Sequence, residues 1–315
     1  MKICVFGNKS ATSELLKHLT SNNTRPHTLA TLSKESFGKI EISGSDVNIC
    51  SQAESLGINV YTTDSYGLKN AHDQDFFTKQ AFDLGICTGW QRLIPKEILN
   101  TFKLGVFGWH GSGFNLPNGR GRSPLNWTIR LGLKEVFHNC FKYSEDADTG
   151  HIYETLRFDI NEDDYIADVL EKAKAHIKGS SLRLIRDATN GEITLSRQGN
   201  YPAIAFPALN EASGKIDPSV FLAKDVINII RSCSSPFPGS YLYVQDNNTK
   251  IRIWKAEINE DIKDLKDLKI GYARIMGKAL FIRCKDKAIK VNDFEFEFES
   301  TKAFNDLEGA DFFSR

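Results

Sequence analysis

The sequence predicts an α/β protein, with a Rossmann-like parallel sheet followed by a small β-barrel. Three observations lead to this prediction. Short apolar runs alternate with helical patterns through the first half of the chain, and prolines and small polar residues gather near residue 200. Beyond them, short alternating runs are separated by turn residues, which is typical of small barrels. We therefore expect two domains, residues 1–203 and 204–315.

The expected strands of the first domain are short and apolar, and helical patterns separate them. The first is Ile3–Phe6, and the pattern after it runs through Leu15, Leu16 and Leu19. The others cover residues 57–61, 83–87 and 105–109. Such strands pair in parallel with helices on both faces, and ligands bind beyond their carboxyl ends. The segment after the first strand lacks G-x-G-x-x-G, which argues against a dinucleotide site.

The rest of the chain is expected to form a further strand, a long helix and the barrel. The helix follows Asn161–Asp164, because apolar residues from Ile166 to Ile177 recur on one face. We expect the strand at 136–143, a linker at 202–214 and a second helix at 220–232. The expected barrel strands are a hairpin of 241–244 and 251–254 around Asp246–Asn248, followed by 279–283 and 288–291.

Composition narrows the class of protein. Forty basic residues balance forty acidic ones, so an affinity that depends on neutralising many phosphates is disfavoured. The six cysteines form no C-x-x-C pair, which is typical of reduced thiols in the cytoplasm. No apolar run reaches the roughly 18 residues of a membrane span, and the opening strand is too short for a signal peptide. We therefore expect a cytoplasmic protein without a membrane partner.

Two segments at expected strand ends carry residues suited to proton transfer. His110 follows the strand at 105–109 within a glycine-rich loop, and histidine exchanges protons near neutral pH. Asp148 lies in a turn after the strand at 136–143, where it could reach His110. Taken separately, a structural histidine and a solvated acidic turn remain open alternatives.

Together these segments resemble the folate-dependent formyltransferase family, which includes methionyl-tRNA formyltransferase and the sugar N-formyltransferases. The matching residues are His110, Ser112, Leu116, Pro117, Arg120, Gly121, Pro124, Asp148 and Gly150. Residues 120–127 look especially like the enzyme domain that formylates UDP-linked 4-amino-4-deoxy-arabinose, and residues 83–95 are similar to the strand and loop of the folate pocket. Residues 214–217, 230–231, 236–240 and 250–256 resemble the family's OB-like carboxy-terminal domain.

The resemblance implies roles for particular residues. His110 would handle the proton of the acceptor amine, and Asp148 would orient His110. The formyl donor would be 10-formyltetrahydrofolate, and no metal would be needed. The implied folate-binding residues are Ile86, Trp90, Arg92, Leu93, Ile94, Asp146 and Asp148. The implied substrate-binding residues are Asn8, Lys9, Ser112, Arg120, Arg122 and Asn126, although Arg120 and Arg122 could equally hold their own loop.

The chain departs from the family pattern at the catalytic asparagine, whose position is Gly108 here. Two extra residues also separate His110 from Pro117. That asparagine is thought to donate to the developing oxyanion, and the loss of such a donor costs about 10²–10³ in rate. Asn115 is our expected substitute, with Ser112 or a glycine N–H as alternatives. A slow enzyme or an inactive folate-binding homologue also remains open.

The acceptor is expected to be a nucleotide-linked amino sugar, formylated for a bacterial surface glycan. The tRNA-specific branch carries a basic insertion after its second strand, and the corresponding stretch here is Thr31–Cys50. Its two lysines, Lys34 and Lys39, are outnumbered by three acidic residues, which makes a poor clamp for a phosphate backbone. Methionyl-tRNA formyltransferase remains the alternative. The particular sugar, its nucleotide and the oligomeric state, including a homodimer, stay open.

Overall fold

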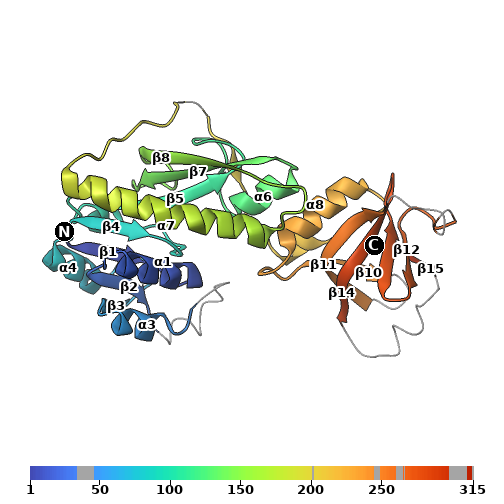
Figure 1. Cartoon of the computed structure of the whole chain (residues 1–315), viewed down its shortest axis with the longest axis horizontal. Helices are drawn as coiled ribbons and strands as arrows, with labels where there is room; N and C mark the ends of the chain where they lie inside the picture. The colour runs from blue at the N-terminus through green and yellow to red at the C-terminus, as the bar shows by residue number, and fades with distance from the viewer. Residues whose placement is uncertain are drawn as a thin grey trace. The chain divides into compact units, whose positions relative to one another are not determined.

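The computed structural model describes residues 1–33, 46–200, 202–244, 249–259, 265, 267–297 and 311–313. The chain divides into two compact units, and Figure 1 shows the elements of each. The first unit comprises residues 1–124, 136–158 and 171–206. The second comprises residues 125–135, 159–170 and 207–315. Within the described part of the chain, no helix is long and apolar enough to span a membrane.

The first unit contains a seven-stranded sheet in the order β3-β2-β1-β4-β5-β7-β8. The strands are β1 (Ile3–Phe6), β2 (Thr28–Leu32), β3 (Asn59–Thr63), β4 (Leu84–Cys87), β5 (Gly105–Ser112), β7 (Glu135–Lys142) and β8 (Ile152–Asp159). The pairs among β1 to β5 are parallel, as the alternating pattern predicted. β7 instead runs antiparallel to β5, so the sheet is mixed. The chain between β5 and β7 does not cross back to the beginning of β5. It instead brings Phe137, near the start of β7, beside Ser112 at the end of β5.

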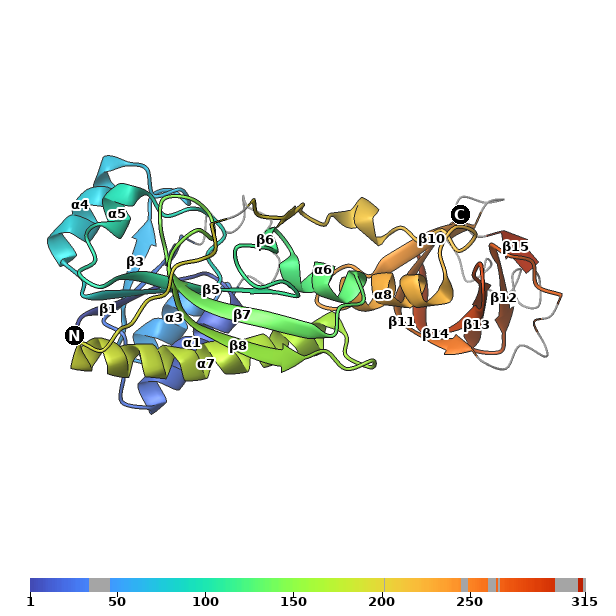
Figure 2. The same cartoon turned by 90° about the horizontal axis from the view of Figure 1, so that it is seen from above.

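Helices cover both faces of this sheet, as Figure 2 shows for α4 and α5 on one side and α1 and α7 on the other. One apolar layer joins the sheet to α1 (Ser10–Ser21), α3 (Ile49–Ser55) and α7 (Ile166–Asn190). The other joins it to α4 (Ala71–Gln80) and α5 (Lys96–Leu99). Both faces of the central strands β1 and β4 are therefore buried, which explains why their sequences are apolar throughout.

The second unit contains a six-stranded antiparallel sheet in the order β10-β11-β14-β13-β12-β15. Its strands are β10 (Ser240–Val244), β11 (Thr249–Asn259), β12 (Tyr272–Met276), β13 (Ala279–Arg283), β14 (Ala288–Glu297) and β15 (Asp311–Phe313). The apolar face of α8 (Ala223–Cys233) packs on this sheet around Ile230 and Ile253. The predicted pairing of 241–244 with 251–254 is confirmed, and the curled sheet fits the expected barrel-like domain.

Shorter elements lie outside the two sheets. α6 (Pro124–Arg130) follows β6 (Arg120–Gly121), which pairs in parallel with β9 (Ala205–Phe206). The expected linker at 202–214 thus contains β9 and the 3₁₀ helix η1 (Glu211–Gly214). The predicted turn at Asp246–Asn248 lies outside the described residues, as does most of the Thr31–Cys50 stretch, residues 34–45.

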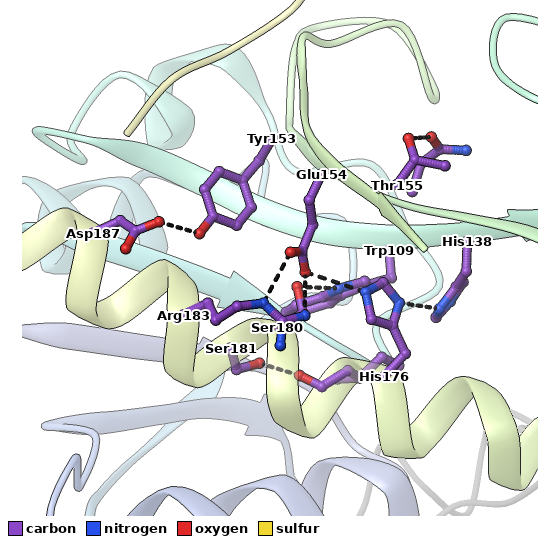
Figure 3. Close-up of polar contacts among 12 residues, drawn as sticks. Trp109, His138, Tyr153, Glu154, Thr155, His176, Ser180, Ser181, Arg183 and Asp187 are labelled. Carbon is purple, nitrogen blue, oxygen red and sulfur yellow. Dashed lines mark hydrogen bonds and ion pairs between the residues drawn. The ribbon is translucent and has the colours of Figure 1, made fainter. Parts of the chain in front are cut away.

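A buried polar network joins β7 and β8 to α7 (Figure 3). His138 and His176 are linked through their Nδ1 atoms at 2.7 Å, and His176 Nε2 lies 3.2 Å from Glu154 Oε1. Arg183 contributes two bonds of 3.0 Å to the same carboxylate. Burial raises the pKa of Glu154, but hydrogen bonds from His176, Arg183 and Ser180 bring it down to about 2. The carboxylate is therefore ionised when it fastens the sheet to α7.

We predict that Glu154→Gln lowers the free energy of unfolding by about 1–3 kcal/mol at pH 7, because two charged hydrogen bonds are lost. Since the pKa of Glu154 is held below its ordinary 4.5, at about 2, its contribution is complete above pH 4.5 and is lost as pH falls toward 2. Urea unfolding across this range should show the difference between variant and wild type shrinking. Glu171→Gln is the control. It removes an exposed ion pair with Lys174 on α7 and should change the free energy of unfolding by less than about 0.5 kcal/mol. A constant difference down to pH 2 would contradict the assignment.

Candidate active site

The two faces of β5 serve different purposes. Trp109 points toward α7, where its Nε1 donates to Ser180 Oγ at 3.1 Å. Because side chains alternate along a strand, Gly108, His110 and Ser112 share the opposite face. Their partners across the antiparallel pair are Phe141, Asn139 and Phe137, so the same face of β7 continues the site.

His110 is fixed by a hydrogen bond at one ring nitrogen. Its Nε2 lies 2.7 Å from the backbone oxygen of Gly119, and the side chain is 7% exposed. A carbonyl oxygen only accepts, so Nε2 carries the proton in this contact. Nδ1 is then the basic nitrogen of the neutral ring, and it lies 3.5 Å from Asp148 Oδ2. The group that orients His110 is therefore the Gly119 carbonyl, whereas Asp148 faces the nitrogen that would receive a proton.

The Gly119 carbonyl is positioned by a turn that only glycine suits. Gly119 has φ +73, and a Cβ there would collide with the Ser112 side chain. Its N–H donates to Ile204 O at 2.9 Å, and Arg122 N donates to Phe206 O at 3.0 Å. The glycine-rich loop after β5 is thus closed against residues 204–206, which the sequence had suggested only as linker.

Asp148 lies in a turn held by a side chain that the sequence analysis missed. Its backbone is in the left-handed region at φ 56, which aspartate adopts more readily than most residues. Gln198 Nε2 donates to the carbonyls of Asp148 and Gly150, at 2.8 and 2.7 Å. Arg120 in turn donates to Gln198 Oε1 at 2.5 Å. Arg120 therefore supports the Asp148 turn, and no sequence pattern pointed to Gln198.

A cavity of about 230 Å³ opens beside Asp148. Two loops line it, one after β4 and one after β7, together with Phe141 and Tyr143. Of the expected folate-binding residues it includes Trp90, Arg92, Leu93, Ile94, Asp146 and Asp148. Leu93 is 60% exposed on this surface, and the buried Trp90 Nε1 has no hydrogen-bond partner in the described structure. The lining of the cavity is therefore aromatic, apolar and acidic, and one of its residues, Trp90, carries a buried N–H without a partner in the described structure.

The other expected site residues lie elsewhere. Ile86 is fully buried in the layer beneath α1 and α7, and Asn115 is exposed in a turn. Neither is among the residues that line the cavity. Ser112 is buried, and its Oγ accepts from Phe114 N at 3.2 Å. Asn126, in the second unit, donates to Ser232 O at 2.8 Å, which links α6 to α8.

Asn8 and Lys9 lie together at the carboxyl end of β1, where α1 begins. Asn8 is fully buried, and neither polar atom of its amide has a partner within the described residues. Lys9 is half-buried, and desolvation lowers the pKa of its ammonium group. A buried amide, a lysine and the amino end of a 12-residue helix together favour an anion.

Two further features lack this combination of groups. A larger cavity of about 590 Å³ lies in the second unit beside α8 and β11, where Arg231 donates to the carbonyls of Asp164 and Asn161. Asp64, His72 and Asp73 cluster near β3, but His72 pairs with Asp64 and Asp73 already accepts from Tyr61. The groups suited to proton transfer are those around His110.

The fold is that of a formyltransferase. Residues 1–182 match the family model described as Formyl transferase, and residues 215–307 match that of the Formyl transferase C-terminal domain. The chain therefore belongs to the formyltransferase family.

Particular relatives differ in their acceptors. The chain is 29% identical to the methionyl-tRNA formyltransferase of Brucella ovis over 242 residues, which is 76% of this chain and 75% of that protein. Its fold is similar to that of an N-formyltransferase from Helicobacter canadensis solved with folinic acid and dTDP-3-aminofucose, with 17% identity, coverage of 94% and 100%, and a TM-score of 0.66. The methionyl-tRNA formyltransferase of Clostridium thermocellum gives a TM-score of 0.59 at 16% identity, with coverage of 95% and 100%.

We predict that Gly119→Ala destabilises the protein more than its left-handed backbone alone requires. The backbone cost is about 1–2 kcal/mol, and the collision with Ser112 adds about 1–3 kcal/mol. Gly191→Ala is the matched control, because Gly191 has φ +75 with nothing within 4 Å of its Cβ position. Urea unfolding should separate the two variants. Equal losses would mean that the Gly119 turn tolerates a side chain.

Proposed function

We propose that this protein transfers a formyl group from 10-formyltetrahydrofolate to the amine of a nucleotide-linked amino sugar, making a formamido sugar for a bacterial surface glycan. The observation that carries the proposal is the pairing of His110 with Asp148 at the end of β5, 3.5 Å apart, beside the cavity that Asp148 lines. A proton acceptor next to a site for a flat ligand is the arrangement that acyl transfer to an amine requires.

The donor is consumed as a substrate, and its pterin ring fits the character of the cavity. The ring is flat and carries several hydrogen-bond acceptors, one of which would satisfy the orphan N–H of Trp90. The volume of about 230 Å³ is below the 300–1,000 Å³ of cavities that enclose a whole drug-sized ligand. We expect the cavity to hold the pterin and the remainder of the folate to extend over the exposed Leu93.

The residues of the site divide the chemistry between them. The Gly119 carbonyl keeps the Nε2 proton in place, so His110 Nδ1 removes the proton from the amine as it attacks the formyl carbon. Asp148 stabilises the resulting imidazolium across 3.5 Å. His110 then returns this proton to the folate nitrogen as the bond from that nitrogen to the formyl carbon breaks. The products are a formamide and tetrahydrofolate.

The proposed acceptor rests on the charge of the chain and on the groups at the end of β1. The chain has zero net charge, which gives little attraction for a long nucleic acid. A diphosphate presents a small, concentrated negative charge, which suits Lys9, Asn8 and the amino end of α1. The Helicobacter canadensis neighbour was solved with a dTDP-linked amino sugar, which supports the same class of acceptor.

We predict that His110→Ala lowers kcat at least about 100-fold, because the general base is lost. Binding of folinic acid, measured by calorimetry, should change less than threefold, since His110 does not line the cavity. His151→Ala, at an exposed histidine after the Asp148 turn, is the control and should keep wild-type activity. Retention of a tenth of the wild-type rate by His110→Ala would remove His110 from the mechanism.

The alternative acceptor is initiator methionyl-tRNA, which the Brucella relative favours. We predict turnover of 10-formyltetrahydrofolate with at least one 3-amino or 4-amino sugar linked to dTDP or UDP, and none with methionyl-tRNA at micromolar concentrations. The Michaelis constant for the sugar should vary weakly with salt, because only a diphosphate is bound. Formylation of tRNA with an affinity that falls at a log–log slope of about −0.9 per phosphate contact would overturn the choice of acceptor.

A further inference from the structure

Formyl transfer to an amine places negative charge on the formyl oxygen, so the site needs a hydrogen-bond donor for it. Neither Ser112 nor Asn115, the two side-chain donors that the sequence suggested on the loop after His110, lines the cavity. His110 Nε2 donates to Gly119 O, and the buried Ser112 hydroxyl accepts from Phe114 N. Asn115 is exposed, and its backbone oxygen accepts from Asn118 N in a turn.

Tyr143 fills the space beside Gly108. An ideal Cβ on Gly108 would lie 2.5 Å from the Tyr143 Cζ and closer still to its hydroxyl. The amide nitrogen of an asparagine is about 2.4 Å from its own Cβ, two covalent bonds away. The hydroxyl therefore lies within the volume that an asparagine side chain at position 108 would occupy. Tyr143 reaches this place because it immediately follows β7, where its N–H donates to Val106 O at 2.7 Å.

The surroundings of Tyr143 suit a donor. Its side chain lines the cavity together with Asp148, and it packs against Phe141 with 5.2 Å between the ring centroids. Burial and the neighbouring Cys87 raise the pKa of Tyr143, so the phenol keeps its proton. The hydroxyl hydrogen-bonds to the Cys87 thiol, whose pKa burial raises to about 12. The phenol O–H is the donor in this contact, and sulfur is a weak acceptor, so a ligand oxygen can replace the sulfur as the partner of the phenol proton.

We propose that the Tyr143 hydroxyl is the donor to the formyl oxygen, in the role that an asparagine at position 108 would otherwise fill. This proposal rests on the proposed formyl transfer. As the amine nitrogen bonds to the formyl carbon, the carbonyl electron pair moves to the oxygen and accepts the Tyr143 hydrogen bond. The pair re-forms the carbonyl when the bond to the folate nitrogen breaks, and His110 carries the amine proton to that nitrogen. Tyr143 itself gains and loses no proton.

The test uses the full chain and the stable donor analogue 10-formyl-5,8-dideazafolate, so it needs no acceptor. Isotope-edited infrared spectroscopy reports the formyl carbonyl stretch of the bound analogue, which a hydrogen bond lowers. Tyr143→Phe should move the stretch to higher wavenumber while the dissociation constant changes less than threefold. Tyr153→Phe, whose hydroxyl bonds Asp187 on the other face of the sheet, is the control and should leave the stretch unchanged.

Asn139 supplies the rival donor. It is fully buried opposite His110, and its Nδ2 has no partner in the described structure. It does not line the cavity, so we expect Asn139→Ala to leave the stretch in place. A stretch that moves with Asn139→Ala and not with Tyr143→Phe would overturn the proposal.

Kinetics with an acceptor give a second readout. Tyr143→Phe should lower kcat by about 10²–10³ with little change in the Michaelis constant for the donor. Gly108→Asn alone should lose activity, because its side chain collides with Tyr143. The double variant Gly108→Asn/Tyr143→Ala should have a kcat at least tenfold higher than Tyr143→Ala alone, because the asparagine amide then occupies the space that the tyrosine has left.

The two readouts separate the two proposals. If wild-type protein formylates no amine, the proposed function fails, and the infrared shift still decides whether Tyr143 contacts the formyl oxygen. Wild-type kcat in Tyr143→Phe, or no recovery in the double variant, would overturn the role of Tyr143 while leaving formyl transfer intact.

Discussion

The hydrogen bond from His110 Nε2 to the Gly119 carbonyl is the contact on which the site depends, because it decides which nitrogen of the ring is basic. With Nε2 protonated, Nδ1 faces the Asp148 carboxylate. The carbonyl can reach the ring only because Gly119 adopts a left-handed backbone over Ser112. The Gly119 N–H is held by the backbone oxygen of Ile204. A loop of glycines and a late segment of the first unit thus determine the chemistry of a residue on β5.

β5 and β7 separate the chemistry of the site from its support. On the face toward α7, ionised Glu154 binds His176 and Arg183 and holds the edge of the sheet in place. The other face carries His110 and Tyr143, and the cavity opens on it beside Asp148. An active site held to within a fraction of an ångström needs such a rigid scaffold behind it. The antiparallel pairing of β5 with β7 supplies it, since it fixes Gly108 and His110 against β7, and the bond from Tyr143 N–H to Val106 O continues the pairing.

The sequence predicted much of the fold because the central strands β1 and β4 are buried on both faces and therefore form continuous apolar runs. β2 was not among the expected strands, since its two threonines dilute the run. The direction of β7 was not predictable, because a single strand carries no record of which neighbour it will join. His110 and Asp148 were proposed from their places at expected strand ends, and the loop at 90–94 was proposed from the family resemblance. Gln198 was not, since its contacts join positions about 50 residues apart through two carbonyls.

Gly108 marks the limit of motif reasoning. The sequence indicated a missing donor and suggested its replacement within the same loop, at Asn115. The structure instead places Tyr143, which immediately follows β7, beside the Gly108 Cα. A glycine inside a buried strand often signals close approach by another group, and that was the one available hint.

The most direct measurement of this account is the tautomer of His110. In ¹⁵N-labelled protein, with the His110 signals assigned by their loss in His110→Ala, nitrogen chemical shifts and couplings to the ring protons identify the protonated nitrogen. We expect the neutral form of the ring to carry its proton on Nε2, with Nδ1 unprotonated. A neutral His110 that carries its proton on Nδ1 would contradict this expectation, because the unprotonated nitrogen would then face the Gly119 carbonyl, which cannot donate to it.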